Sequence, residues 1–421
     1  MSNSTPARGR SRPEGLHTLA RGLVVFVVPD FEPTIGGTTR QTANEARALL
    51  GRGYDAIVLT QRIDPSWPRT ETRDGLRVVR IGPSTRGSLA MKLLDAHVSW
   101  WLWRRRRAIA IVHVVMYPDF AVAAAMARCA SRTVMVWAGV GDATDTLVPT
   151  KERGRDGLRR IRRRVLARNG LHHVALTDLM AAEVGGALGT SRPEVIPTPV
   201  DLTTNRPPEP GPRAEARRAA GVADGEIAVV YAGHLRASKR VDRLVEAVAF
   251  LRDQGVAARL FVVGDSRAEL DDCSAALRAQ VASLGLDDQV RFTGGVADIR
   301  PYLWAADVFV LPSDREGLSN ALLEALACGV PGVASASAGG DQVLDESCGV
   351  VPESADPQVL AAAVRTAADP KRWPDLSAGA RARAARYSIE AVTGQYERLY
   401  ARIGIGGFEA SHRRVRDTDE A

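Results

Sequence analysis

The chain has 421 residues, of which 45% are hydrophobic and 25% are charged, and its mean hydropathy is -0.11. This length allows two domains, each with its own core, and the composition is that of a soluble globular protein. No run of about eighteen apolar residues occurs, which argues against a membrane span. The four cysteines form no Cys-x-x-Cys pair. We therefore expect a cytoplasmic protein without a zinc site or a disulfide framework.

The net charge of +7 is unevenly distributed along the chain. Residues 1–208 hold 31 Lys and Arg against 18 Asp and Glu, a balance of +13, and residues 209–421 hold 25 against 31, or -6; the two sum to +7. This asymmetry suggests that only the first half meets an anionic partner.

The first half alternates short apolar runs with helical patterns, which predicts a parallel sheet with helices on both faces. Strands are expected over 23–28, 56–60, 76–81, 109–115, 134–137 and 173–177, and a helix over 42–50.

Proline-dense segments then predict a linker that continues neither strand nor helix, over 197–199 and 205–212. A second α/β series follows, with strands expected over 227–231, 260–263, 290–292, 308–311 and 332–334 and a last helix over 389–403. We expect residues 1–16 to be a disordered leader and residues 406–421 a disordered tail.

Two carboxylates stand out in the second half, with seven residues between them. Glu316 is expected in the loop that follows the strand at 308–311, and Glu324 about a turn and a half into a helix over 319–328. Both can face one crevice at the carboxyl end of a parallel sheet, where such sheets bind ligands. The amides of Gly317, Leu318 and Ser319 at the helix start suit a phosphate.

The flanking residues make this segment more specific. Glu-Gly-Leu-Ser-Asn begins at Glu316, Leu-Leu-Glu-Ala-Leu-Ala-Cys-Gly-Val-Pro surrounds Glu324, and Gly339-Gly340 follows. Together they resemble the E-x7-E signature of retaining glycosyltransferases with the GT-B fold, family 4 in particular. The resemblance implies two Rossmann-like α/β domains facing across a cleft. These would be an acceptor domain over 17–200 and a nucleotide-sugar donor domain over 201–387. A crossover helix at about 388–405 would pack back on the first domain.

The resemblance also implies roles for the charged residues. Glu324 would accept hydrogen bonds from the donor ribose, and Glu316 would lie near the transferred sugar. Lys239 falls on the family lysine, whose ammonium stabilises the charge that grows on the departing diphosphate. The enzyme would then need no metal and no other cofactor. His234 stands where the family has arginine, and either His234 or Arg236 could complete the donor site.

Three further segments complete the expected site. Val296 ends a loop that in the family contacts the base. Gly36 and Gly37 follow the first strand and allow the backbone to approach donor phosphate and acceptor closely. The family histidine on the acceptor side is missing, and Asp142 or Asp145 could do part of its work.

Two clusters combine basic and apolar residues, one over 100–107 and one over 158–168. They suit an anionic membrane surface, which would place the protein at the inner face of the plasma membrane. The plainer interpretation is that the tryptophans belong to the core and the arginines form a solvated face. Nucleic acid is not expected, because no nucleic-acid-binding motif accompanies the charge.

The sequence therefore favours a retaining, metal-independent hexosyltransferase. It would move a sugar from a nucleoside-diphosphate sugar to a lipid-linked or soluble hydroxyl acceptor, in glycolipid, polysaccharide or glycoside biosynthesis. The alternatives are a non-catalytic GT-B scaffold and another GT-B sugar-nucleotide enzyme of the epimerase type.

Overall fold

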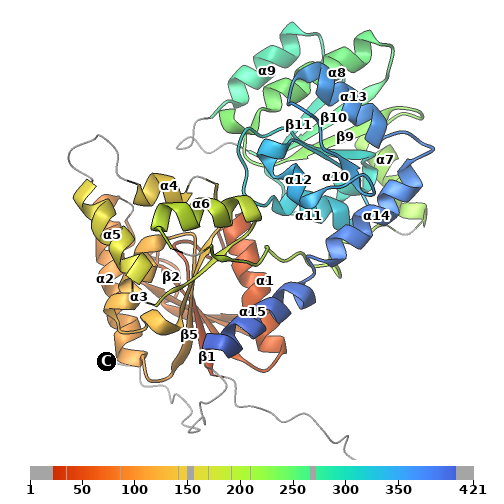
Figure 1. The fold of residues 1–421 in the computed structure, drawn as a ribbon. Coiled ribbons are helices and arrows are strands. Elements are labelled where there is room, and N and C mark those ends of the chain that lie inside the picture. The colour runs from red at the N-terminus through yellow and green to blue at the C-terminus, as the bar shows by residue number, and fades with distance from the viewer. Residues whose placement is uncertain are drawn as a thin grey trace, which may run out of the picture.

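The computed structural model describes residues 22–403, apart from residues 35, 86, 141, 149–155, 169, 191, 209 and 266–271. The expected leader and tail lie outside these residues. Two parallel sheets, each covered by helices, form two α/β domains side by side (Figure 1). We name them the N-terminal and the C-terminal domain after their order in the chain. The α/β class predicted from the sequence is confirmed. No helix in the described ranges combines the length and apolarity needed to cross a bilayer.

The N-terminal domain is built on an eight-stranded sheet of order β3-β4-β2-β1-β5-β6-β7-β8. All neighbours are parallel except β3 and β4. Its central strands are almost continuous Val and Ile runs because helices bury both faces. The strands are β1 (Leu23–Val27), β2 (Asp55–Gln61), β3 (Thr70–Arg73), β4 (Leu76–Ile81), β5 (Ile109–Val115), β6 (Thr133–Trp137), β7 (His172–Ala175) and β8 (Glu194–Val195).

Helices connect these strands in alternation, and α2, α3 and α5 form a continuous layer in which α2 contacts α3 and α3 contacts α5. The helices are α1 (Gly37–Gly51), α2 (Ser88–Arg105), α3 (Pro118–Met126), α4 (Asp142–Leu147), α5 (Asp156–Arg168) and α6 (Asp178–Leu188), with a 3-10 turn at Ala130–Arg132.

The C-terminal domain has a six-stranded parallel sheet of order β11-β10-β9-β12-β13-β14. Its strands are β9 (Ile227–Ala232), β10 (Ala258–Val263), β11 (Val290–Gly294), β12 (Val308–Leu311), β13 (Gly332–Ala334) and β14 (Gly349–Val350). Its helices are α7 (Pro210–Ala220), α8 (Val241–Asp253), α9 (Ser274–Ser283), α10 (Arg300–Ala305), α11 (Asn320–Ala327), α12 (Gly340–Val343), α13 (Pro357–Ala367) and α14 (Trp373–Ala385), with 3-10 turns at Ala237–Lys239 and Ala336–Ala338.

One expectation about the linker is wrong. The proline-dense segment 205–212 was expected to exclude a helix, yet α7 begins inside it, at Pro210. Proline is tolerated in the first turn of a helix, where its missing N–H would have no partner within the helix. The prolines therefore mark the start of α7.

The last helix, α15 (Ile389–Ile403), returns to the N-terminal domain and lies along α1 (Figure 1). A buried polar cluster joins the two helices to β5. His113 Nδ1 lies 2.7 Å from the Tyr400 hydroxyl, and His113 Nε2 lies 3.5 Å from Glu45 Oε2. Gln41 donates a hydrogen bond to the other carboxylate oxygen of Glu45 at 3.0 Å.

Burial keeps both titratable groups of this cluster neutral near pH 7. It raises the pKa of Glu45 to about 8, partly offset by the hydrogen bond from Gln41, and it lowers the pKa of His113 to about 3. Unfolding exposes both groups to water. Above about pH 4.5 the unfolded chain then releases the Glu45 proton that the folded chain retains, so the contribution of Glu45 to stability falls as pH rises toward 8. Below about pH 6.5 the unfolded chain also binds a His113 proton that the folded chain does not, which offsets this fall.

Glu45→Gln should remove this loss. Glutamine keeps the shape and the acceptor for Gln41 but has no proton to release. Between pH 5 and 8 the free energy of unfolding of the wild type should fall by up to about 1.4 kcal/mol per pH unit more than that of the variant. Urea denaturation at a series of pH values measures this difference. Parallel curves would show that Glu45 is already ionised in the folded protein.

Candidate active site

The segment with the two carboxylates lies between the domains, at the carboxyl end of β12. Ser319 caps α11, because its hydroxyl accepts a hydrogen bond from the Leu322 amide at 3.3 Å. The leucines of α11 are buried in the core and fix the helix against the sheet. Glu324 lies on the same helix with only 5% of its surface exposed. A carboxylate is therefore held inside the protein, where it requires a partner.

Glu316 forms an ion pair with Lys239, and each side chain is only 19% exposed. The Asp314 amide donates a hydrogen bond to the Ser238 carbonyl at 3.0 Å. Arg240 also contacts the Asp314 carboxylate, at 3.2 Å. The loop before Glu316 and the turn that carries Lys239 are thus held together by the backbone as well as by charge.

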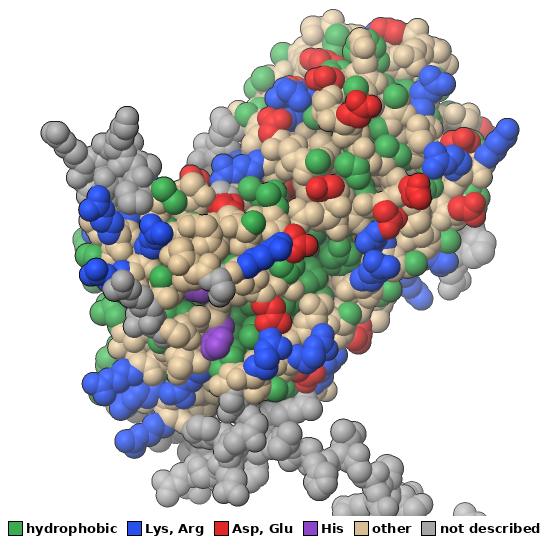
Figure 2. Space-filling view, viewed as in Figure 1, with side chains coloured by type: hydrophobic (Ala, Val, Ile, Leu, Met, Phe, Trp, Pro, Cys, Tyr) green, Lys and Arg blue, Asp and Glu red, His purple; other side chains and the backbone are tan. Residues whose placement is uncertain are grey.

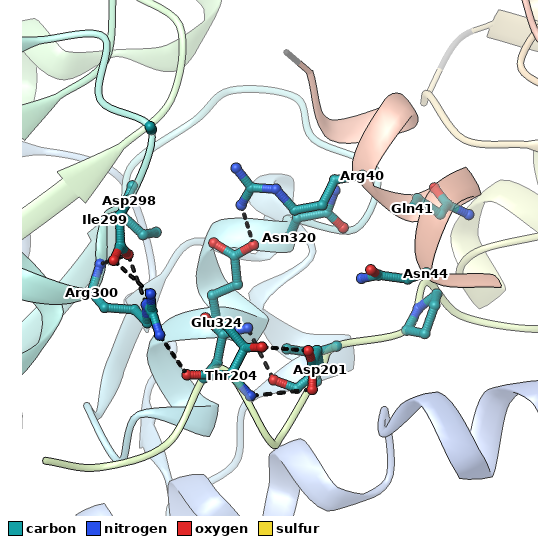
Figure 3. A pocket seen from close by; sticks show the side chains of 14 residues that line it. Arg40, Gln41, Asn44, Asp201, Thr204, Asp298, Ile299, Arg300, Asn320 and Glu324 are labelled. Atoms are coloured by element: carbon teal, nitrogen blue, oxygen red, sulfur yellow. Dashed lines mark hydrogen bonds and ion pairs between the residues drawn. The ribbon is translucent and has the colours of Figure 1, made fainter. Parts of the chain in front are cut away.

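Glu324 finds its partner in the other domain. Arg40, in the first turn of α1, donates a hydrogen bond to Glu324 Oε1 at 2.5 Å (Figure 3). Burial raises the pKa of Glu324, and the positive charge of Arg40 opposes this shift. Arg40 therefore favours the ionised form of a carboxylate, whereas burial favours the protonated form.

A cavity of about 290 Å³ adjoins this pair, and both domains contribute to its walls (Figure 3). Asn44 of α1 faces it from one side and Asp201 of the linker from another. On the opposite side Arg300 binds both oxygens of Asp298, at 2.7 and 2.8 Å. These polar side chains, closed off by Glu324, suit a ligand with several hydroxyl groups.

A second cavity of about 340 Å³ lies where the loop after β1 meets the C-terminal domain, and it is lined by Gly36, Gly37 and His234. Asn320 of α11 donates a hydrogen bond to the Gly37 carbonyl at 3.3 Å. A Cβ atom at position 37 would lie 3.0 Å from the Asn320 side-chain nitrogen. The glycine therefore permits this close contact between the domains.

His234 and Arg236 differ in their exposure and in their hydrogen-bond partners. The His234 ring is exposed, with Nδ1 3.4 Å from the Asp265 carbonyl oxygen. Arg236 is half-buried, and its Nε has no hydrogen-bond partner among the described residues. Val296 is half-buried just after β11, next to Ala297, which lines the first cavity. Of the two basic candidates, His234 is the one that lines the cavity with the glycine loop.

Of the two predicted acceptor-side aspartates, Asp145 is largely exposed on α4. Its carboxylate lies 3.3 Å from the Arg315 guanidinium, which also donates to the Val140 carbonyl at 2.6 Å. Asp142 begins α4, and its side chain lies outside the described residues. Asp145 thus lies at the domain boundary, paired with the residue before Glu316.

Two family models divide the chain between them. The model described as "Glycosyltransferase Family 4" matches residues 35–204, and the model described as "Glycosyl transferases group 1" matches residues 226–369. Together they cover most of both domains. The chain belongs to glycosyltransferase family 4.

Curated relatives of this family 4 chain match it over about half of their length. One is the D-inositol 3-phosphate glycosyltransferase of Geodermatophilus obscurus, 35% identical over 53% of this chain and 50% of that protein. Another is the GDP-mannose-dependent alpha-(1-6)-phosphatidylinositol dimannoside mannosyltransferase of Mycobacterium tuberculosis, 31% identical over 46% of this chain and 48% of that protein.

Solved structures confirm the GT-B architecture over almost the whole family 4 chain. Sucrose-phosphate synthase from Thermosynechococcus elongatus superimposes with a TM-score of 0.76 at 24% identity, over 91% of this chain and 99% of that one. Anabaena HepE in complex with UDP and glucose gives a TM-score of 0.70 at 21% identity, over 90% and 99%.

Sequence reasoning about this family 4 chain missed the residues that join the domains: Arg40, Asn320 and Arg315. All three are adjacent to predicted site residues, Arg40 three positions after Gly37 and the other two beside Ser319 and Glu316. Their proximity in sequence to the glycine loop and the carboxylates could have indicated contacts between the domains, since polar residues beside a predicted cleft often contact the opposite wall of that cleft.

Gly317→Ala should push the domains apart. A Cβ atom at position 317 would lie 2.4 Å from the Ala138 carbonyl oxygen of the other domain, far inside van der Waals contact. We expect a larger radius of gyration in small-angle X-ray scattering and a lower Tm. Gly186→Ala in α6, where the added atom meets open space, is the control and should leave the scattering unchanged. Identical scattering from Gly317→Ala and wild type would contradict the close contact.

Proposed function

We propose that this chain is a retaining glycosyltransferase that moves a sugar from a nucleoside-diphosphate sugar to a hydroxyl acceptor without a divalent metal. The observation that carries the proposal is the Glu316–Lys239 pair, largely shielded from water near the start of α11. It offers a carboxylate for sugar hydroxyls and a cation for phosphate on adjacent side chains.

The donor diphosphate would meet three sources of positive charge. The Lys239 ammonium is one, and the backbone amides that open α11 are another, because partial positive charge gathers at a helix N-terminus. His234 supplies a third donor when protonated, from the wall of the cavity that holds Gly36 and Gly37. Together these groups would offset the charge that a metal ion neutralises in other enzymes.

Glu324 would bind the ribose. In the structure its carboxylate pairs with Arg40, and its buried position next to a polar cavity leaves it able to accept hydrogen bonds from two vicinal hydroxyls. Relatives support this class of donor, since one is described as GDP-mannose-dependent and HepE is described in complex with UDP and glucose.

The transfer step needs no protein nucleophile. The bond between the anomeric carbon and the diphosphate oxygen breaks, and its electron pair stays on the diphosphate. The acceptor oxygen forms its bond on the same face, and its proton passes to the departing phosphate oxygen. Glu316 would hold the sugar hydroxyls, and Lys239 would stabilise the leaving group. Names of relatives point to a polyol acceptor of the inositol class.

A panel of UDP- and GDP-sugars, assayed for nucleotide release with and without polyol acceptors, tests the proposal directly. Acceptor-dependent release from one donor supports it. Release of free sugar epimer without acceptor would favour the epimerase type, and no release from any donor would favour a non-catalytic scaffold.

Glu316→Gln should lower kcat by at least about 10²-fold, because it removes a contact that strengthens as the glycosidic bond breaks. Glu324→Gln should instead act mainly on the KM for the donor, because its contact with ribose is the same before and during transfer. Glu346→Gln, an exposed carboxylate of the same domain, is the matched control. Tm values verify folding. A Glu316→Gln enzyme with more than about a tenth of wild-type kcat would refute the role of Glu316.

Transfer should persist in excess EDTA, since Lys239 supplies the charge that a metal would supply. Lys239→Ala should lose at least about 10²-fold in kcat, and added Mg²⁺ or Mn²⁺ should not restore it. Steady-state rates with and without chelator measure both effects. Complete loss of wild-type activity in EDTA, recovered on adding metal, would overturn the metal-free site.

A further inference from the structure

The exposed face of α2 is apolar although nothing in the described part of the chain covers it. Four large side chains recur there at helical spacing: Leu89 is 72% exposed, Leu93 47%, Trp100 56% and Trp103 47%. The opposite face of the helix is equally apolar and is buried in the core. A helix that is apolar on both sides is normally buried on both sides. We therefore expect a partner to cover the outer face of α2.

Basic residues share this face. Lys92 and Arg104 are exposed on it, Arg107 is exposed in the turn that follows the helix, and the only acidic residue of α2, Asp95, is half-buried and lies outside the exposed stripe. The Arg104 guanidinium lies 5.5 Å from the centre of the Trp100 ring, and Arg106 lies 4.7 Å from that of Trp103. The segment 100–103, with its three tryptophans, is thus split. Trp101 and Leu102 lie in the core, and Trp100 and Trp103 are exposed to solvent.

Helix α5 continues the basic surface. Arg160 and Arg164 are exposed, and between them Ile161 is 62% exposed. Arg162, on another side of α5, binds both oxygens of Asp119 of α3 at 2.6 and 2.7 Å. Because α3 in turn packs against α2, the two helices belong to one layer. Figure 2 shows blue and green side chains together along the left edge of this domain, where Figure 1 has α5 and α2.

We propose that this surface of α2 and α5 docks on an anionic lipid bilayer. Tryptophan and leucine beside arginine match the boundary between acyl chains and headgroups, where apolar side chains enter the bilayer edge and cations meet the phosphates. This inference does not depend on the proposed chemistry of the cleft.

Two other occupants fit less well. A second copy of the chain on a two-fold axis would place this surface against itself, and arginines would face arginines. A nucleic acid would take the arginines but leave the exposed leucines and tryptophans in water. Of these three occupants, the bilayer satisfies both the charge and the apolar area.

Sedimentation with vesicles tests the proposal on the full chain. Vesicles of phosphatidylcholine with 40% phosphatidylglycerol (on the order of a bacterial anionic content) should pellet the protein, and pure phosphatidylcholine should not. The fraction bound should fall as salt rises from about 0.05 to 0.5 M, because screening shortens the reach of the charges. Equal binding to both vesicles, or no binding to the anionic ones, would overturn the proposal.

Two double variants distinguish the contribution of charge to binding from the insertion of tryptophan side chains into the bilayer. Arg104→Glu/Arg107→Glu should weaken binding about tenfold or more, whereas Lys371→Glu/Arg372→Glu, an exposed pair in the C-terminal domain with the same charge change, should not. With brominated acyl chains, wild-type tryptophan fluorescence should be quenched, and Trp100→Ser/Trp103→Ser should lose most of the quenching.

Nucleotide release and Tm confirm that each variant is folded. Light scattering gives the molar mass in solution. If the serine pair converted a dimer into a monomer without changing vesicle binding, the face would be a contact between copies and the proposal would be wrong. Wild-type binding by the Arg104→Glu/Arg107→Glu pair would refute it as well.

Discussion

Arg40 reaches from the first turn of α1 to the buried carboxylate of Glu324, and this contact joins the two domains at the most deeply buried charge of the cleft. A carboxylate with 5% of its surface exposed is costly to ionise unless a cation is near, and no cation of its own domain takes this place among the described residues. In the pair Arg315–Asp145 the charges are exchanged between the domains: the cation belongs to the C-terminal domain and the carboxylate to the N-terminal domain. Each domain therefore neutralises a charge of the other, and separating them leaves both charges unpaired.

This arrangement links closure of the domains to the state of the site. When Arg40 withdraws, burial acts alone and favours the protonated form of Glu324. A ligand with hydroxyl groups can replace the hydrogen bond of Arg40 by donating to the same carboxyl oxygens. Under the proposed function, the donor and the N-terminal domain therefore act on the same group, and the ionisation of Glu324 depends on what occupies the cavity.

The sequence predicted what is determined locally. Strand β12, the loop and α11 follow from an apolar run, a proline, the Ser319 cap and Gly329, and all of these act within the 22 residues 308–329. The Asp74–Gly75 pair also carries a strong hairpin signal, with φ of 46° and 80°, yet β3 was not expected because Thr70–Arg73 is short and polar. A partner such as Arg40 could not be predicted, because its position depends on how two separately folded domains are oriented.

The same limit explains why the contacts of α15 could not be predicted from the sequence. Its helical period is evident from the sequence, but the polar side chains it meets are not: Glu45 of α1 and His113 of β5 lie 68 residues apart and reach Tyr400 only in the folded chain. Helix α15 therefore packs against a buried acid and a buried histidine as well as against apolar side chains, which is an unusual interface inside a domain. The buried hydrogen bond between His113 and Tyr400 specifies one register for α15 more narrowly than apolar packing would.

The charge asymmetry of the chain gains a physical meaning once the surfaces are located. Residues 1–208 carry +13 and residues 209–421 carry -6, and the basic apolar surface of α2 and α5 lies on the first of these. Under the proposed docking, an anionic bilayer would attract the first of these segments more than the second, which would turn the molecule so that α2 and α5 face the lipid. Helix α5 contacts α4, which carries Asp145 at the boundary between the domains. Docking would thus bring the N-terminal side of the cleft toward the membrane and leave the carboxylates of the C-terminal domain on the far side, where a water-soluble nucleotide-sugar can reach them.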